Sequence, residues 1–148
     1  MKILKVDKWE NKTLICMAGI PYSGKSTMAK EIAAEKNAPI VCPDCIRVAI
    51  HGCKFIPSAE GLVWAIAKIM VSSLFLTGID NVILDATNTT PERRKEWMSS
   101  KWNTVFYAVD TSKEECIKRA KDLGDYTILP IIEKMFEQKD FNDICESC

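Results

Sequence analysis

The stretch Gly19-Ile-Pro-Tyr-Ser-Gly24-Lys25-Ser26-Thr27 decides how the rest of the chain is interpreted. It follows the apolar run Thr13–Ala18, which predicts a buried strand, and it leads into Lys25–Lys36, whose apolar spacing predicts a helix. A GxxxxGK[ST] pattern between a strand and a helix is the context of a phosphate-binding P-loop. We therefore expect this stretch to bind the phosphates of a nucleotide.

The residue types in this loop follow from its chemistry. Glycines let consecutive backbone N–H groups turn inward around a phosphate, and the helix that follows directs its positive end at the same point. Lys25 is expected to reach the β- and γ-phosphates, and the Ser26 hydroxyl is expected to bind Mg²⁺. The residues predicted to bind the nucleotide are Gly19, Ser23, Gly24, Lys25, Ser26 and Thr27. No motif that would recognise the nucleotide base is visible, so the sequence does not distinguish ATP from GTP as the donor.

The composition is typical of one globular domain, since 47% of the 148 residues are hydrophobic and 20 basic side chains balance 20 acidic ones. A formal charge of zero argues against a protein that coats nucleic acid without regard to sequence, because such proteins are usually basic overall. The charge is uneven, however: nine basic and five acidic residues give residues 1–54 a net charge of +4. We expect a single domain over residues 1–148 in which any polyanion meets a local basic patch.

The cellular location is predicted from the N-terminus and from the longest apolar stretch. The first ten residues are rich in charge and lack the apolar core of a signal peptide, so we expect a cytoplasmic protein. Leu62–Ile79 contains Lys68, which a spanning helix would bury in lipid. We interpret this stretch as a mostly buried helix of a soluble protein, with no membrane as a partner. The sequence indicates no particular oligomeric state.

Short β-branched runs alternate with longer helical patterns along the chain, which predicts βαβ units and a parallel sheet. Residues 1–10 are predicted to form an N-terminal extension that adds an edge strand, and Met28, Ile32 and Ala33 are predicted to face the core. Further strands are predicted at Pro39–Cys42, Asn81–Leu84 and Val105–Val109. Further helices are predicted at Asp44–His51, at Ser58–Leu76 with Ser58 as the cap, from Thr90 onward, at Ser112–Leu123 and at Leu129–Gln138. The expected fold class is α/β, a three-layer sandwich with a short parallel sheet of about four strands and helices on both faces.

Asp44 and Arg47 are the first candidates for catalysis. Neither the NKxD nor the DxxG element of guanine-specific switches occurs in a plausible position, whereas a kinase needs a carboxylate for the acceptor hydroxyl and cations for the migrating phosphoryl group. The two residues follow the second strand, and their i, i+3 spacing places both on one helical face. Ligands of such sheets bind at the carboxyl ends of the strands. The alternative is that Asp44 only caps its helix and Arg47 is solvated.

Asp85 is the second candidate, because it follows the apolar strand Asn81–Leu84. An acid at this place commonly holds Mg²⁺ or its waters in P-loop proteins. The alternative is a turn at the end of a strand that uses Asp85 and Asn88 as turn formers.

These motifs together resemble the 5′-kinase domain of bacteriophage and bacterial polynucleotide kinases, which act in nucleic-acid end repair. The resemblance covers residues 13 to about 138. It rests on GIPYSGKST, on Asp44-Cys-Ile-Arg47, on Asp85-Ala-Thr-Asn88 followed by Pro91-Glu-Arg-Arg-Lys-Glu-Trp97, and on Lys118-Arg119 followed by Pro130 and an apolar helix. It implies a P-loop kinase that transfers the γ-phosphate of a nucleoside triphosphate, with Mg²⁺ or Mn²⁺, to a 5′-hydroxyl end of DNA or RNA. A phage-encoded protein of this kind would work in the host cytoplasm.

The resemblance also implies roles for single residues. Lys25 and Ser26 would hold phosphate and Mg²⁺, Asp44 would be the general base, and Arg47 would clamp the phosphate nearest the acceptor. Asp85 would lie on the acceptor side and touch the metal through water, although members of the family place this acid at one of two adjacent positions.

The resemblance further implies a small C-terminal lid over about residues 119–130, with residues 139–148 as a tail. Arg119 would bind the donor from this lid. Leu123 stands where the family often places a second arginine, so Arg119 would act alone or with Lys121. The alternative is that Arg119 is an exposed helix charge.

Other functions stay open at this point. A small-molecule or protein kinase on the same fold would need the same donor site, and a nucleotide-binding module without catalysis would share the P-loop. Two C-x-x-C pairs, Cys42 with Cys45 and Cys145 with Cys148, would together suit a structural zinc site, and a redox role is a weaker alternative. Disulfides are not expected among seven cysteines without a secretory signal.

The remaining aromatic and basic residues give weaker signals. Tyr22 lies within the loop and is the aromatic residue most suited to face a ligand. Arg93 and Arg94 suit nucleic-acid phosphates or an exposed helical face equally. His51 is interpreted as a helix-end residue, and core positions are predicted for Trp64, Phe75, Trp97 and Phe106.

Overall fold

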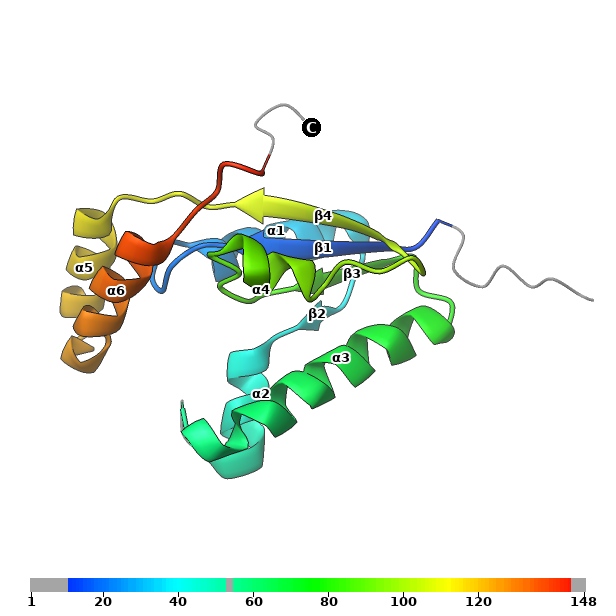
Figure 1. Ribbon diagram of the computed structural model, residues 1–148, viewed down its shortest axis with the longest axis horizontal. Coiled ribbons are helices and arrows are strands. Elements are labelled where there is room, and N and C mark those ends of the chain that lie inside the picture. Colours follow the sequence, from blue (N-terminus) through cyan, green and yellow to red (C-terminus); the bar gives the residue numbers. More distant parts are fainter. Residues whose placement is uncertain (1–10, 53–54, 145–148) are drawn as a thin grey trace, which may run out of the picture.

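The computed structural model describes residues 11–52 and 55–144, and four parallel strands form its centre (Figure 1). The strands are β1 (Thr13–Ala18), β2 (Ile40–Val41), β3 (Asn81–Leu84) and β4 (Asn103–Ala108), in the order β2-β3-β1-β4. β1 lies inside the sheet, where Thr13 is aligned with Asn81 on one side and with Asn103 on the other. The predicted short parallel sheet of about four strands is therefore confirmed.

Alternate residues of the strands contribute to two separate hydrophobic cores, one on each face of the sheet. Leu14 and Cys16 pack with α3 (Glu60–Leu76), whereas Ile15 and Met17 pack with α1 (Lys25–Lys36) on the other face. This alternation is what a strand buried on both faces requires, since successive side chains point to opposite sides. The two helical layers around the sheet are the predicted three-layer sandwich.

The other helices lie around the carboxyl ends of the strands. They are α2 (Pro43–His51), the short 3₁₀ turn η1 (Pro57–Ala59), α4 (Pro91–Lys95), α5 (Lys113–Asp122), the turn η2 (Tyr126–Ile128) and α6 (Leu129–Gln138). Thr90 and Ser112 cap α4 and α5 by accepting hydrogen bonds from the backbone of Arg93 and Glu115. Figure 1 shows α5 and α6 side by side at the end of the sheet toward which the strands point. A third core joins this hairpin to the loop after β1, through Ile20, Cys116, Ala120 and Ile132.

Several predicted boundaries and burial positions were wrong. β2 has only two residues, and β4 begins at Asn103 because that residue still aligns with Thr13. Ser58 is not a helix cap, since it lies within η1 and α3 begins only at Glu60 after an N-cap with no side-chain hydrogen bond. Met28 is exposed, because Lys25 and Ala29 occupy the buried side of α1.

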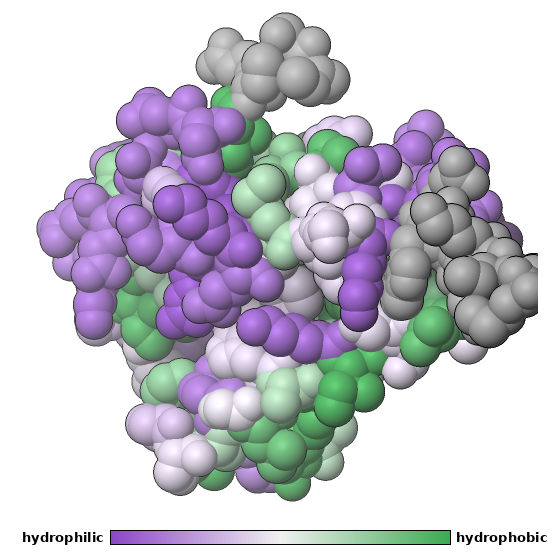
Figure 2. Space-filling model, turned by 45° about the vertical axis from the view of Figure 1, so that its right-hand side comes forward, coloured by the Kyte–Doolittle hydropathy of each residue, from purple (hydrophilic) through white to green (hydrophobic). Residues whose placement is uncertain are grey.

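α3 is buried on one side only, which contradicts the prediction that it is mostly buried. Its buried side chains are Val63, Ala67, Val71 and Phe75. Leu62, Ile69 and Leu76 on the opposite side are 54%, 64% and 57% exposed. The helix lies over one face of a narrow sheet and nothing in the described part of the chain covers its outer side. Figure 2 shows apolar side chains gathered over the lower part of the molecule, where α2 and α3 lie in Figure 1.

Within residues 11–52 and 55–144, one helix, Pro57–Leu76, is long and apolar enough to cross a membrane by length and composition, with 22% of the segment buried. One such helix is weak support for a membrane span, because core helices pass the same test.

The aromatic residues predicted for the core divide into two groups. Phe75 and Trp97 are buried, whereas Trp64 and Phe106 are only partly buried and pack against the same core. The predicted edge strand in residues 1–10 lies outside the described residues.

Candidate active site

The loop between β1 and α1 has a backbone that depends on its two glycines. Gly24 has φ 96° and precedes α1 directly, a conformation that side chains other than hydrogen disfavour. Gly19 has an ordinary φ, but a Cβ there would lie 2.5 Å from the Ser23 hydroxyl and 3.1 Å from the Val109 carbonyl. Tyr22 has φ 64°, which makes it one of the few non-glycine residues in the left-handed region. The tight loop predicted from the sequence is thus built by close contacts at Gly19 and by the turn at Gly24.

Neighbouring segments hold this loop in place. The Gly19 N–H donates to the carbonyl of Thr87 at 2.8 Å, and the Thr111 hydroxyl donates to the carbonyl of Ser23 at 2.6 Å. Lys25 is buried at the start of α1. Ser23, Lys25, Ser26 and Thr27 all line one large cavity at this end of the sheet. The Lys25 cation and the first turn of α1 therefore lie at the same cavity, as phosphate binding requires.

Two oxygens in this region are buried and have no hydrogen-bond partner among the described residues, namely Ser23 Oγ and Asp85 Oδ1. Asp85 follows β3 directly and lines the cavity together with Ser26. A buried carboxylate oxygen that lacks a donor is costly unless a cation or water satisfies it. The Ser26 hydroxyl and the Asp85 carboxylate are therefore the groups that would hold a hydrated divalent cation in this cavity.

Asp44 and Arg47 lie on one face of α2, as their spacing predicted. Arg47 Nη1 donates to Asp44 Oδ1 at 2.6 Å, and both residues line the cavity. The Asp44 side chain is 77% exposed, whereas that of Arg47 is only 11% exposed. The cap of α2 is Cys42, whose sulfur accepts from the backbone N–H of Cys45. Asp44 therefore does not serve as the cap and Arg47 is not solvated, so both structural alternatives for this pair are wrong.

Glu60 is a member of this group that the sequence did not indicate. Its two carboxylate oxygens accept from Arg47 Nε at 2.8 Å and from Nη2 at 2.6 Å, which is a bidentate pair. The hydrogen bonds to Glu60 raise the pKa of Arg47, and the hydrogen bonds from Arg47 lower the pKa of Glu60. Glu60 begins α3, thirteen residues after Arg47, so no helical spacing connects the two. Only the folding of α3 beside α2 brings them together.

Arg119 reaches from α5 to the phosphate-binding loop. Its Nη1 donates to the Tyr22 carbonyl at 3.1 Å, and its Nε donates to Glu115 at 3.0 Å. A Cβ on Gly24 would lie 3.5 Å from the same Nη1. Arg119 is therefore an exposed helix charge that also contacts the loop. Leu123 lines the cavity and is 75% exposed, without a cationic group at that position.

The Tyr22 hydroxyl donates to Asp125 at 2.8 Å, beyond the end of α5, and Tyr22 lines the cavity. The predicted lid region thus holds the phosphate-binding loop at two points, through Arg119 and through Asp125.

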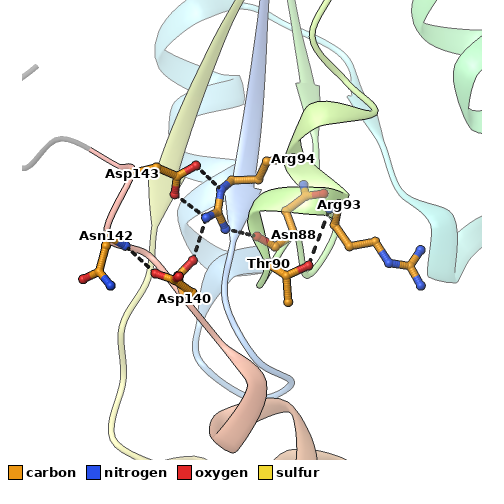
Figure 3. Close-up of polar contacts among 7 residues, drawn as sticks. All are labelled: Asn88, Thr90, Arg93, Arg94, Asp140, Asn142 and Asp143. Atoms are coloured by element: carbon orange, nitrogen blue, oxygen red, sulfur yellow. Dashed lines mark hydrogen bonds and ion pairs between the residues drawn. The ribbon is translucent and has the colours of Figure 1, made fainter.

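Arg93 and Arg94 follow one another in α4 but lie in different surroundings (Figure 3). Arg94 is 2% exposed, and it donates to the Asn88 carbonyl at 2.8 Å, to the Asp140 carbonyl at 2.6 Å and to the Asp143 carboxylate. Neither interpretation of Arg94 from the sequence was right, since it is neither an exposed charge nor accessible to a nucleic-acid phosphate. Arg93 is exposed and lines the cavity.

Of the cysteines near the site, Cys42 has a structural role. Burial raises the pKa of the Cys42 thiol to about 12, and its sulfur caps α2. Cys16, Cys42, Cys45 and Cys116 are free. The second pair needed for the zinc hypothesis, Cys145 and Cys148, lies outside the described residues. His51 is the last residue of α2, as expected.

The cavity joins the predicted donor and acceptor groups at one end of the sheet. Its walls include Lys25, Ser26, Asp44, Arg47, Asp85 and Arg119. The structure therefore brings together all the predicted catalytic side chains, from four separate segments of the chain.

Two solved structures of a Pnkp1 complex are similar to this chain. One, a Pnkp1/Rnl/Hen1 complex, matches with 27% identity and a TM-score of 0.66 over 73% of this chain and 38% of that one. A second, the Pnkp1/Rnl/Hen1 RNA repair complex, matches with 23% identity and a TM-score of 0.67 over 88% of this chain and 47% of that one. The chain thus spans less than half the length of these two proteins.

A small-molecule kinase shares the fold as well. A gluconokinase from Sinorhizobium meliloti 1021 matches with 18% identity and a TM-score of 0.60 over 88% of this chain and 77% of that one. Among curated proteins, none matches the sequence. A protein-family model described as an AAA domain matches residues 14–125. The chain therefore belongs to this AAA-domain family, and within it has the P-loop kinase fold of polynucleotide-kinase type.

Proposed function

We propose that the chain is a polynucleotide 5′-hydroxyl kinase, which transfers the γ-phosphate of ATP or GTP to the 5′-hydroxyl end of DNA or RNA. The observation that carries the proposal is the position of Asp44, an exposed carboxylate held by Arg47, in the same cavity as the phosphate-binding loop. A nucleotide-binding module without catalysis has no use for an accessible carboxylate and a buried guanidinium in the cavity of its phosphate-binding loop. The pair is what phosphoryl transfer to a hydroxyl requires.

In the proposed reaction, the 5′-oxygen of the acceptor forms a bond to the γ-phosphorus while the bond from that phosphorus to the β,γ-bridging oxygen breaks. The hydroxyl proton passes to Asp44, and the nucleoside diphosphate leaves. Arg47 occupies Asp44 Oδ1, so Oδ2 is the atom that we assign to the proton. Because the base mainly orients the hydroxyl in such transfers, a held carboxylate suits the role.

The cations of the site would stabilise the charge on the migrating group. Lys25 would bind the β- and γ-phosphates, Arg47 would face the acceptor side of the phosphoryl group, and Arg119 would close the donor side. Glu60 would keep the Arg47 guanidinium in place, because a bidentate pair fixes the plane of the group. Ser26 and Asp85 would hold Mg²⁺ or Mn²⁺, which would offset phosphate charge when bound.

The choice of acceptor rests on the resemblance of residues 85–88 and 91–97 to the polynucleotide kinases and on the likeness to a chain solved in an RNA repair complex. A small-molecule acceptor is the second candidate, since the gluconokinase is matched over a larger share of its own length than the Pnkp1 chains are.

The deciding experiment is an acceptor panel with labelled ATP or GTP and Mg²⁺. The panel holds 5′-hydroxyl DNA and RNA oligonucleotides, the same oligonucleotides already carrying a 5′-phosphate, nucleosides, and sugars such as gluconate. The proposal expects label on the 5′-hydroxyl oligonucleotides and none on the 5′-phosphorylated ones. Label on a sugar or nucleoside, with none on any oligonucleotide, would establish the second candidate instead.

A further inference from the structure

Two thiols that the proposed reaction does not use enclose the candidate base. Cys42 is the N-cap of α2 and Cys45 lies in its first turn, with Pro43 and Asp44 between them. Both thiols are free in the structure. A C-x-x-C pair at the start of a helix is the arrangement in which two cysteines exchange between dithiol and disulfide. Where thiols are otherwise kept reduced, such a bond is usually transient and responds to oxidation.

The two cysteine side chains are already in contact. The Cys45 backbone N–H donates to the Cys42 sulfur at 3.4 Å. Burial, followed by a hydrogen bond with the Cys45 side chain, raises the pKa of Cys42 to about 12. Residues three apart at the start of a helix have Cα atoms about 5 Å apart, which is within the range that a disulfide bridges. Pro43 stands in the first turn, where it suits the helix. A disulfide can therefore close across this turn without unfolding it.

The two thiols differ in their access to solvent. Cys45 is exposed and lines the cavity, whereas Cys42 is only partly exposed. An oxidant in solution therefore reaches Cys45 first, and Cys42 is placed to attack the modified sulfur from within the protein. Cys16 and Cys116 are buried in hydrophobic cores, so they lack this access.

We infer that Cys42 and Cys45 form a reversible disulfide around Asp44, which lowers phosphoryl transfer until the bond is reduced. The inference rests on the proposed function, because the disulfide acts on transfer through Asp44. In the first step, the Cys45 thiolate attacks one sulfur of a small disulfide such as oxidised glutathione, and one glutathione thiolate leaves. In the second step, the Cys42 thiolate attacks the Cys45 sulfur, the bond between the two Sγ atoms forms, and the second glutathione thiolate leaves. The two cysteine protons end on the two glutathione thiols, so one small disulfide is reduced for each protein disulfide formed.

The position of Asp44 depends on the turn that the disulfide tightens. Bonded sulfurs lie closer together than two thiols in contact, so the backbone from Cys42 to Cys45 must adjust when the bond forms. Arg47 cannot follow this adjustment, because Glu60 of α3 holds its guanidinium through two hydrogen bonds. The 2.6 Å contact between Arg47 and Asp44 is therefore disturbed. Small misplacements of a catalytic group are costly, since about 1 Å can lower a rate on the order of a hundredfold.

The test uses the full chain in glutathione buffers that range from fully reduced to fully oxidised. The main variant carries Cys53→Ser, Cys145→Ser and Cys148→Ser, which removes the three cysteines outside the described residues. The matched control adds Cys45→Ser to this variant. Mass spectrometry of the intact protein and of its unreduced peptides measures the bond between Cys42 and Cys45. Labelled transfer to the best acceptor of the panel measures activity, and calorimetric titration with a donor analogue measures donor binding.

In the oxidised buffer we expect the peptide that holds Cys42 and Cys45 to lose the mass of two hydrogen atoms. Transfer should fall about tenfold or more in the wild type and in the main variant. Donor affinity should stay unchanged, because the phosphate-binding loop lies on another segment. Dithiothreitol should restore both the mass and the activity. The control with Cys45→Ser should transfer like the reduced protein in both buffers.

The outcomes separate this inference from the proposed function. Absence of the Cys42–Cys45 bond in the oxidised buffer overturns the inference, and so does a bond that leaves transfer unchanged; both results leave the proposed function intact. If the acceptor proves to be a sugar or a nucleoside, loss of that transfer on oxidation supports the inference while the polynucleotide acceptor is refuted. A reduced protein that transfers to no acceptor refutes the proposed function, and the control of transfer with it.

Discussion

Arg47 binds two carboxylates that differ in their surroundings. Glu60 is mostly buried and binds the guanidinium through two hydrogen bonds, whereas Asp44 is mostly exposed and uses one oxygen. A side chain fixed in this way loses little further freedom when a phosphoryl group arrives. In the proposed reaction, this group would therefore need little further ordering when the substrates bind.

Asp44→Asn is expected to lower transfer about 10²- to 10⁴-fold, because the amide keeps the shape of the side chain but takes up no proton. Donor affinity should be almost unchanged, since Asp44 does not belong to the phosphate-binding loop. Labelled transfer under single-turnover conditions and calorimetric titration with a donor analogue measure the two quantities. Loss of donor binding in the variant would contradict a role limited to the acceptor.

Glu60→Gln is expected to lower the free energy of unfolding at pH 7 by about 1–3 kcal/mol, because it removes charge-assisted hydrogen bonds to Arg47. The pKa of Glu60 lies below its ordinary 4.5 in the folded protein. The stabilisation is therefore complete above about pH 4.5 and is lost as the pH falls through the lowered pKa. Urea denaturation at about pH 7 and pH 3 measures the change, with Glu92→Gln on the exposed side of α4 as the control. An equal difference from wild type at both pH values would contradict the pairing.

For single residues, the sequence predicted contacts between residues that are close in the chain. Asp44 and Arg47 are three positions apart in one helix, so their contact could be predicted. Glu60 and the Arg94 partners Asp140 and Asp143 lie on other segments, and single residues of these types occur on any surface. Their roles follow from packing, which residue spacing does not describe.

The helices of this molecule differ in how much of each is buried. α3 packs through one stripe, Val63, Ala67, Val71 and Phe75, and leaves its other apolar side in solvent. The sequence could not distinguish the two sides, because both are apolar and amphipathic periodicity is therefore weak. The strand positions were predicted more accurately than the burial of α3, because strands buried on both faces give continuous apolar runs.

Phe75→Ala is expected to destabilise the protein by about 3–5 kcal/mol, since it removes a large buried ring next to Trp102. Ile69→Ser on the exposed side of the same helix should change the stability by about 0.5 kcal/mol or less. Thermal and urea unfolding of both variants test this difference. A comparable loss in Ile69→Ser would show that the outer side of α3 is covered in solution.

Arg119→Ala is expected to lower transfer strongly at saturating donor, because no second arginine stands at Leu123 to replace it. The side chain contacts the loop at the Tyr22 carbonyl, so the donor KM should also rise. Lys118→Ala, which removes a neighbouring charge that does not line the cavity, is the control. Turnover like that of wild type at saturating ATP or GTP would remove Arg119 from the site.

One buried arginine connects several parts of the molecule. Arg94 joins α4 to the segment after α6, through the Asp140 carbonyl and the Asp143 carboxylate, and to the loop after β3 through the Asn88 carbonyl (Figure 3). The Asn88 side chain in turn donates to the Met17 carbonyl of β1 at 2.9 Å. Contacts that start from one side chain thus connect the sheet, α4 and the C-terminal segment.

Arg94→Ala is expected to lower the free energy of unfolding by about 3–5 kcal/mol, because it leaves buried acceptors and a carboxylate without their donor. Arg93→Ala should change it by about 0.5 kcal/mol or less, which makes the neighbouring residue a matched control. Chemical denaturation followed by tryptophan fluorescence measures both. A small loss in Arg94→Ala would show that the C-terminal segment contributes little to the folded state.

At the scale of the molecule, the alternation of strands and helices was enough to predict the sheet and its layers. Parallel strands joined by helices place their carboxyl ends at one edge, so the common location of the loop, Asp44 and Asp85 followed as well. The attachment of the C-terminal segment did not follow, because no regular element is involved and its contacts are hydrogen bonds to backbone carbonyls and one carboxylate that pairs with a distant arginine.

The segments on either side of the α5–α6 hairpin are both anchored. Asp110 precedes α5 and pairs with Lys139, which follows α6, while the Asp140 N–H donates to the Thr89 carbonyl at 2.8 Å. At its other end the hairpin contacts the phosphate-binding loop, where the Tyr22 hydroxyl donates to Asp125 and the Arg119 guanidinium donates to the Tyr22 carbonyl. The position of Arg119 relative to that loop is therefore fixed by contacts at both ends of the hairpin.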